Sequence, residues 1–73
     1  MTKLPVTSGT KAVKAFSRAG WSANRQTGSH IIMEKVGSIV TLSVPIHREL
    51  DRGTLRKLIK LAGLTVEEFV DLF

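Results

Sequence analysis

The sequence predicts an α+β domain in which two helices cover one face of a three-stranded antiparallel sheet. The order is α-β-β-β-α, with a short third helix at the C-terminus. Three observations support this fold class: apolar residues recur at helical spacing near both ends of the chain, they alternate with polar residues in its middle, and glycines separate these stretches. A sheet covered on one face buries every apolar stripe, and seventy-three residues are expected to form one domain, 1–73.

The first helix is expected to run from a cap at Ser8 to about Ala19, with Gly20 as its C-terminal stop. Residues 1–7 contain Pro5 and few anchors, so they are expected to form an extended lead-in. The side chains expected to face the core are Val13 and Phe16, flanked by Ala12 and Ala19. Three cations are expected to lie in line on the opposite face, namely Lys11, Lys14 and Arg18.

The strands are expected over residues 21–25, 29–35 and 38–44. A turn at 26–28 joins the first two, and a tight hairpin around Val36 and Gly37 joins the last two. Trp21 is the expected core anchor of this segment.

The phase of the strands decides which side chains face the helices. In the third strand the apolar residues alternate with Thr41 and Ser43, as in a sheet with one covered face; they are Val40, Leu42 and Val44. The second strand contains three consecutive apolar residues, 31–33, so both phases are compatible with it. We favour Ile32 pointing inward, which would place His30 at the rim of the helix-covered side.

Pro45 is expected to end the sheet, and residues 46–53 form a loop that contains His47. The second helix is expected from about Thr54 to Ala62, closed by Gly63. Its apolar face comprises Leu55, Leu58, Ile59 and Ala62. Thr65 and Glu68 fit a capping box for the last short helix. The side chains available to pack from that helix are Val66, Phe69, Val70 and Leu72.

Charge indicates a polyanionic partner. The chain carries a net charge of +5, and three of its six acids lie in the last seven residues, so residues 1–66 carry +8. Nucleic acid is the leading candidate for such a surplus, although solubility alone is an alternative explanation. A second basic patch joins the cations of the first helix; it comprises Arg52, Arg56, Lys57 and Lys60. Cations at the start of a helix add to its dipole and favour a bound phosphate there.

Several classes of protein are disfavoured. The chain has no cysteine, which excludes disulfides and cysteine-ligated zinc, and its two isolated histidines argue against a structural metal site. No cofactor is expected. No apolar run approaches the ~20 residues of a membrane span, and the N-terminus lacks the pattern of a signal peptide. We therefore expect a cytoplasmic protein.

His30 is the candidate catalytic residue, because an imidazole can act as a general acid and base and because it follows a glycine-containing turn at the start of a strand. Such a position holds a side chain rigidly and leaves it accessible. The alternative is an ordinary surface or half-buried histidine.

A series of short motifs resembles the HicA (YcfA-like) mRNA interferase toxins of type II toxin–antitoxin systems. The motifs are Gly20-Trp21, Gly28-Ser29-His30, Val44-Pro45-Ile46-His47, Gly53-Thr54-Leu55, and Ala62-Gly63-Leu64 with Glu68-Phe69. The resemblance covers nearly the whole chain and depends on the order and spacing of the motifs. It implies a fold like that of a double-stranded RNA-binding domain, cleavage of mRNA with His30 essential, and a HicB-type antitoxin that masks this histidine. Ile31 departs from the aromatic or long polar residue common after the histidine, and the role of His47 is left open.

An RNase of this kind needs no cofactor, since the 2′-hydroxyl of RNA is the nucleophile. A histidine can serve as general base and general acid, and a nearby cation can stabilise the charge on the phosphate. Arg25 is the favoured cation, and the amides of Gly28 and Ser29 are further candidates for phosphate contact. With one visible acid–base group we expect a slow enzyme that is monomeric when free and has weak sequence specificity.

Two alternatives remain open. The chain could be a non-catalytic RNA-binding module of the same fold, in which His30 is structural. It could also be a protein-interaction domain whose positive charge meets an acidic protein surface.

Overall fold

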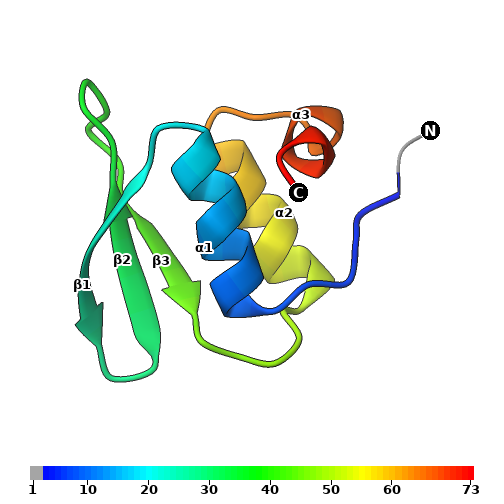
Figure 1. Cartoon of the computed structure of the whole chain (residues 1–73), viewed down its shortest axis with the longest axis horizontal. Helices are drawn as coiled ribbons and strands as arrows, with labels where there is room; N and C mark the ends of the chain where they lie inside the picture. The colour runs from blue at the N-terminus through cyan, green and yellow to red at the C-terminus, as the bar shows by residue number, and fades with distance from the viewer. Residues whose placement is uncertain (1–2) are drawn as a thin grey trace.

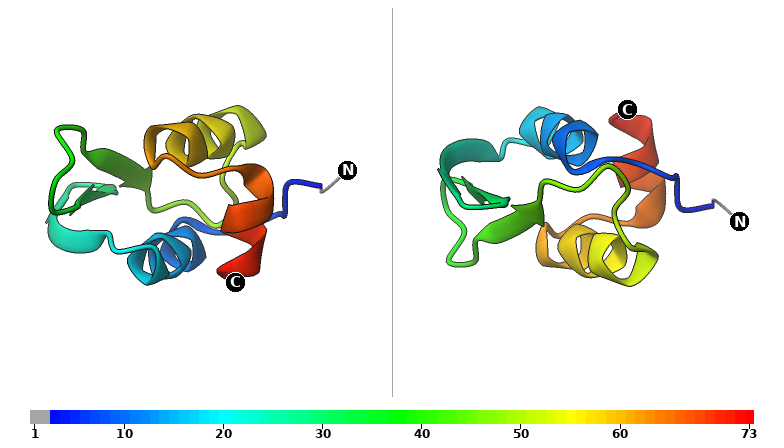
Figure 2. Two further views of the ribbon diagram at one scale, coloured as in Figure 1. Left: turned by 90° about the horizontal axis from the view of Figure 1, so that it is seen from above. Right: turned by 90° about the horizontal axis from the view of Figure 1, so that it is seen from below.

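The computed structural model describes residues 3–73 of the chain. The elements follow the order α1 (Gly9–Arg18), β1 (Ser22–Thr27), β2 (His30–Glu34), β3 (Leu42–Pro45), α2 (Arg52–Leu61) and α3 (Val66–Asp71). The strands form one antiparallel sheet in the order β1-β2-β3. Helices α1 and α2 lie on the same side of this sheet, and α3 lies at their far end (Figures 1 and 2). The predicted fold class is confirmed.

Helix α1 begins and ends as predicted. The side chain of Ser8 accepts a hydrogen bond from the Lys11 amide at 3.2 Å. At the other end Gly20 takes a φ of 96°, and the Trp21 amide donates to the Phe16 carbonyl, a Schellman ending that glycine permits. The buried face comprises Gly9, Ala12, Ala15 and Phe16. Val13 and Ala19 are only partly buried, so the inner stripe is rotated toward Ala15, which the sequence interpretation omitted.

The N-terminal lead-in has more anchors than predicted. Leu4 and Thr7 are buried, and the Thr7 carbonyl accepts a hydrogen bond from the Leu50 amide at 2.8 Å. Residues 1–2 of the predicted lead-in lie outside the described part of the chain. Leu4 thus joins the hydrophobic core, and Thr7 is tied to the loop before α2.

The strand boundaries differ from the prediction at both hairpins. Strand β1 continues through residues 26–27, and the turn consists of Gly28 and Ser29, where Gly28 takes a φ of 55°. The last β2–β3 pair is Met33 with Leu42, so residues 35–41 form a loop in place of a tight hairpin. Val40, expected in the third strand facing the core, lies in this loop and is exposed. It lies beyond the last β2–β3 pair, so the strand alternation that buries Leu42 and Val44 does not extend to it.

The predicted phase of β2 is wrong. Met33 is fully buried opposite Leu42, and Ile31 packs on the core opposite Val44. Ile32 pairs with Ser43 and therefore projects from the other face, as does His30. The apolar run at 31–33 permitted both phases, and the two buried residues of β3 decide between them.

Helix α2 starts two residues earlier than predicted. Asp51 caps it by accepting hydrogen bonds from the amides of Gly53 and Thr54, so the preceding loop covers residues 46–50. The predicted apolar face is confirmed, since Leu55, Leu58, Ile59 and Ala62 are all buried. Gly63 ends the helix with a φ of 77°.

Helix α3 closes the end of the core away from the sheet. The predicted capping box is present, with the Thr65 amide donating to Glu68 and the Glu68 amide donating to Thr65. The ring of Phe69 is fully buried, with its centroid 5.1 Å from that of Phe16 in α1. Val66 and Leu72 pack on the same core.

One close approach of the backbone fixes the sheet against the helices. A Cβ placed on Gly9 would lie 1.9 Å from the carbonyl oxygen of Pro45, at the end of β3. The Gly9 amide also donates to the His47 carbonyl at 2.9 Å. The absence of a side chain at Gly9 therefore allows the start of α1 to contact the strand that lies beside His30.

Candidate functional site

His30 is the first residue of β2 and lies between Thr27 of β1 and Pro45 of β3. The neighbouring Ser29 carbonyl accepts a hydrogen bond from the Ile46 amide at 2.7 Å, which ties the β1–β2 turn to the end of β3. The Ser29 hydroxyl lies 3.4 Å from Nδ1 of the imidazole. The backbone of His30 is held between two strands, and because the residue is only half-buried its ring remains accessible.

His30 lines a surface hollow of about 440 Å³ at the β3 edge of the sheet, where residues of β2, β3 and α2 meet; we call it the His30 hollow. The other lining residues are Thr41, Ser43, Pro45, Thr54, Lys57, Leu58 and Leu61. The imidazole and the Lys57 ammonium thus share one concave surface. An imidazole can transfer a proton there, and an ammonium can stabilise a negatively charged group such as a phosphate.

Lys57 was predicted only as one member of a basic patch. The structure separates it from the other cations of α2, because Arg52, Arg56 and Lys60 are exposed and do not line the His30 hollow. The polar residues Thr41, Ser43 and Thr54 also line it, and the sequence interpretation missed them as site residues. The correct phase of β2 would have identified Ser43 as a site residue. Ser43 pairs with Ile32 and lies between the buried Leu42 and Val44, so it projects from the same face of the sheet as Ile32 and His30.

The other residues predicted near His30 lie in its neighbourhood. Gly28 and Ser29 form the turn immediately before it. Arg25 pairs with Ile32, and Thr27 pairs with His30, so Arg25 projects from the same face of the sheet as His30. Arg25 is exposed, and it does not line the His30 hollow.

The cations of α1 form a separate surface. Lys11, Lys14 and Arg18 line a hollow of about 160 Å³ with Ala15, Leu72 and Phe73. Arg18 donates a hydrogen bond to the Leu72 carbonyl at 2.5 Å, so one of these cations contacts the C-terminal segment. The structure therefore does not bring this stripe together with His30.

His47 is exposed and lies outside the His30 hollow. Its carbonyl accepts the hydrogen bond from Gly9, which is a backbone contact at the start of α1.

Two comparisons with known proteins agree with this picture. A protein family described as HicA toxin of bacterial toxin-antitoxin matches residues 9–64. A chain from a toxin–antitoxin complex of Streptococcus pneumoniae is 37% identical, with a TM-score of 0.71; the match covers 80% of this chain and 98% of that chain. A comparison with the curated proteins finds no match.

The fold and these two matches define a small toxin domain with an architecture like that of double-stranded RNA-binding domains. The chain belongs to the HicA toxin family of bacterial toxin–antitoxin systems. The family match includes both sides of the His30 hollow, β2–β3 and α2. Within residues 3–73, none of the helices is long and apolar enough to cross a membrane.

Proposed function

We propose that this toxin is a metal-independent endoribonuclease that cleaves mRNA, with His30 as the general acid and base. The observation that carries the proposal is that His30 and Lys57, contributed by the sheet and by α2, line the same accessible hollow. This arrangement supplies a proton-transfer group and a cation at one position, which are the two functions that cleavage of RNA requires from a protein.

The reaction uses the 2′-hydroxyl of the substrate as nucleophile. The neutral imidazole of His30 takes the proton of this hydroxyl while its oxygen attacks the adjacent phosphorus. Lys57 stabilises the charge that develops on the phosphate, and Arg25, on the same face of the sheet, assists in holding the backbone. The P–O5′ bond then breaks, and the imidazolium returns the proton to the leaving 5′-oxygen, which gives a 2′,3′-cyclic phosphate and a 5′-hydroxyl.

RNA binding outside the hollow is assigned to the remaining basic residues. The amides of Gly28 and Ser29 would contact phosphate next to the reacting group. The exposed cations on the two helices would contact the backbone; they are Lys11, Lys14, Arg18, Arg52, Arg56 and Lys60. Backbone contacts carry little sequence information, so weak sequence specificity is expected.

The partner that controls the toxin is a HicB-type antitoxin, and the free toxin is a monomer in this proposal. The similar chain from Streptococcus pneumoniae comes from a toxin–antitoxin complex, which supports a protein partner of this kind. An antitoxin that covers the His30 hollow would exclude RNA from it.

Replacement of His30 by alanine or glutamine tests the catalytic role. We expect each variant to lose about 10²–10⁴-fold in the cleavage rate of a purified mRNA transcript, because one acid–base group contributes about this much. RNA binding should persist, and EDTA should leave the wild-type rate unchanged. Induced expression of the wild type should arrest growth, while His30→Ala at equal soluble level should not.

His47→Ala is the matched control, since His47 is exposed and lies outside the His30 hollow. This variant should cleave at nearly the wild-type rate. If the wild type binds RNA without cleaving it, a non-catalytic RNA-binding module becomes the better description. If His30→Ala cleaves normally, the assignment of His30 as the catalytic residue fails.

A further inference from the structure

The β2–β3 loop exposes aliphatic side chains at the end of the sheet opposite to His30, which begins β2. Val36 and Ile39 are fully exposed, at 101% and 102% of their reference accessibility, and Val40 is 36% exposed. Leu61, near the end of α2, is 41% exposed. We call these four residues the apolar rim; Figure 1 shows the loop that carries the first three projecting from the sheet.

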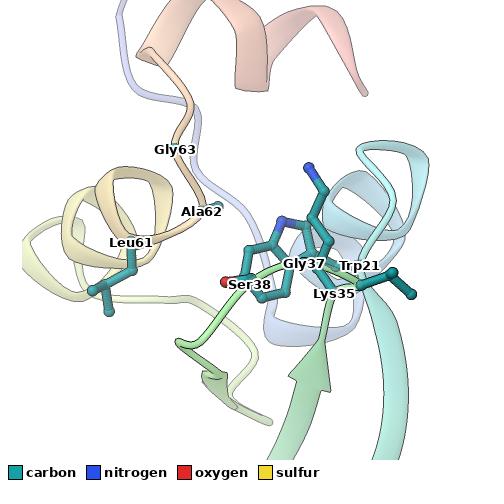
Figure 3. Close-up of a pocket in the computed structure, with 8 residues that line it drawn as sticks. Trp21, Lys35, Gly37, Ser38, Leu61, Ala62 and Gly63 are labelled. Carbon is teal, nitrogen blue, oxygen red and sulfur yellow. The ribbon is translucent and has the colours of Figure 1, made fainter.

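A second hollow lies between this loop and the end of α2. It has a volume of about 290 Å³, and Figure 3 shows it bounded by the β2–β3 loop on one side and by the α2–α3 turn on the other. The lining residues are Trp21, Lys35, Val36, Gly37, Ser38, Leu61, Ala62 and Gly63. We call it the Trp21 hollow. Gly37 and Gly63 lie on its two walls, and a Cβ on either would contact no atom of residues 3–73 within 4 Å.

Leu61 lines both the Trp21 hollow and the His30 hollow. The two hollows are therefore neighbouring parts of one surface, with an exposed leucine at their junction. A chain segment that filled the Trp21 hollow and crossed Leu61 would enter the space beside His30 and Lys57.

The chemistry of this surface favours a protein over RNA. Binding is favoured when apolar groups of a partner bury the exposed side chains of Val36 and Ile39. Nucleic acid offers mainly phosphates, sugars and polar base edges for such a contact. The charged residues that line the two hollows within residues 3–73 are Lys35 and Lys57, and no carboxylate is among the lining residues. The complementary ligand is thus a segment with one or two aliphatic or aromatic side chains flanked by carboxylates.

We propose that the apolar rim and the Trp21 hollow form a docking site for an acidic, apolar segment of the antitoxin. The segment anchors on Val36 and Ile39, fills the Trp21 hollow, and extends over Leu61 to obstruct the His30 hollow. Inhibition is then steric, with no rearrangement of the catalytic residues. This inference rests on the proposed function for the consequence of docking, whereas the docking itself is independent of catalysis.

The test uses the whole 73-residue chain and its cognate antitoxin. Val36→Ser with Ile39→Ser removes both exposed anchors and leaves every residue of the His30 hollow in place. We expect the double variant to bind the antitoxin at least about tenfold more weakly by calorimetry, since two aliphatic side chains no longer become buried. Its melting temperature and its RNA cleavage without antitoxin should match the wild type, and more antitoxin should be needed to stop cleavage.

Val6→Ser is the matched control, because Val6 is also exposed, at 70%, and lines neither hollow. It should bind the antitoxin like the wild type. The inference is overturned if the double variant binds and is neutralised normally, if Val6→Ser weakens binding equally, or if the double variant loses RNA cleavage while antitoxin binding is unchanged. It is also overturned if sedimentation shows that the loop mediates dimerisation of the free toxin.

The same measurements distinguish a failure of the proposed catalytic function from a failure of the proposed docking site. If wild-type toxin cleaves no RNA but its binding to the antitoxin depends on Val36 and Ile39, the docking site stands and the catalytic proposal fails. If the wild type cleaves RNA and substitution of Val36 and Ile39 does not change antitoxin binding, the catalytic proposal stands and the docking site fails.

Discussion

At the scale of single residues, Gly9 has a role that its position in a helix would not reveal. Alanine is normally preferred over glycine in helices by up to about 1 kcal/mol. Here the Cβ of an alanine would lie 1.9 Å from the Pro45 carbonyl oxygen, and that neighbour is backbone. We therefore expect Gly9→Ala to lower the free energy of unfolding by about 1–3 kcal/mol, the usual cost of overpacking. Urea denaturation would measure it.

Gly53→Ala is the corresponding control at the start of α2. Its Cβ would lie 3.1 Å from Oδ2 of Asp51, which is the end of a side chain and can shift slightly. The gain in helix propensity offsets this contact, so stability should change by less than about 0.5 kcal/mol. Equal destabilisation by the two substitutions would contradict the close-approach argument.

The residue scale also shows where prediction from sequence stops. The caps at Ser8 and Thr65 and the buried ring of Phe69 follow from spacings of three or four residues, which the chain itself displays. The orientation of His30 depends on which of the residues 31–33 lies opposite Leu42 and Val44. A run of three apolar residues does not contain that information, and pairing between strands supplies it.

At the scale of elements, α3 depends on its N-terminal cap because it has only six residues. The Thr65 hydroxyl accepts the hydrogen bond of the Glu68 amide at 3.1 Å, and the Glu68 carboxylate accepts that of the Thr65 amide at 2.9 Å. Thr65→Val keeps the shape and removes the hydroxyl. We expect it to destabilise the protein by about 1 kcal/mol, a typical value for a lost cap, as measured by thermal unfolding.

Glu67 and Glu68 provide a matched pair for the same element. Both lie in the first turn of α3 and both interact favourably with the helix dipole, but only Glu68 completes the capping box. Glu68→Ala should therefore destabilise the protein more than Glu67→Ala. If both variants lose the same stability, the dipole accounts for the effect and the reciprocal hydrogen bonds contribute little.

The helices were predicted from the sequence more accurately than the strands, because the apolar pattern of a helix is local in the chain. The apolar face of α2 comprises residues three and four positions apart, so it was correct in full. The sequence predicts residues 38–41 as the start of the third strand, because Val40 continues the alternation of Leu42 and Val44, but the structure places them in the loop over residues 35–41. The side chains of Ile39 and Val40 are exposed at the end of the sheet opposite to His30, so a local hydrophobic pattern did not predict core packing.

At the scale of the whole molecule, the basic residues of the two longer helices form two separate surfaces. One lies at α2 and includes Lys57 in the His30 hollow; the other lies along α1, where Lys14 lines a hollow next to the C-terminal segment. A sequence pattern shows that both helices carry cations, but it does not show which cation approaches the histidine, because that depends on the packing of α2 beside β3. The net charge of +5 supports RNA affinity from either surface.

Lys57→Gln and Lys14→Gln separate binding from catalysis. Each substitution removes one exposed cation, so each should weaken RNA binding and reduce the slope of log K against log salt concentration by about one. Only Lys57 lies in the His30 hollow, where it can stabilise the transition state. At saturating RNA we therefore expect Lys57→Gln to cleave about 10²-fold more slowly and Lys14→Gln to cleave at the wild-type rate. Single-turnover cleavage across a salt series measures both effects, and equal rates for the two variants would assign Lys57 to backbone binding and return the cation at the phosphate to Arg25.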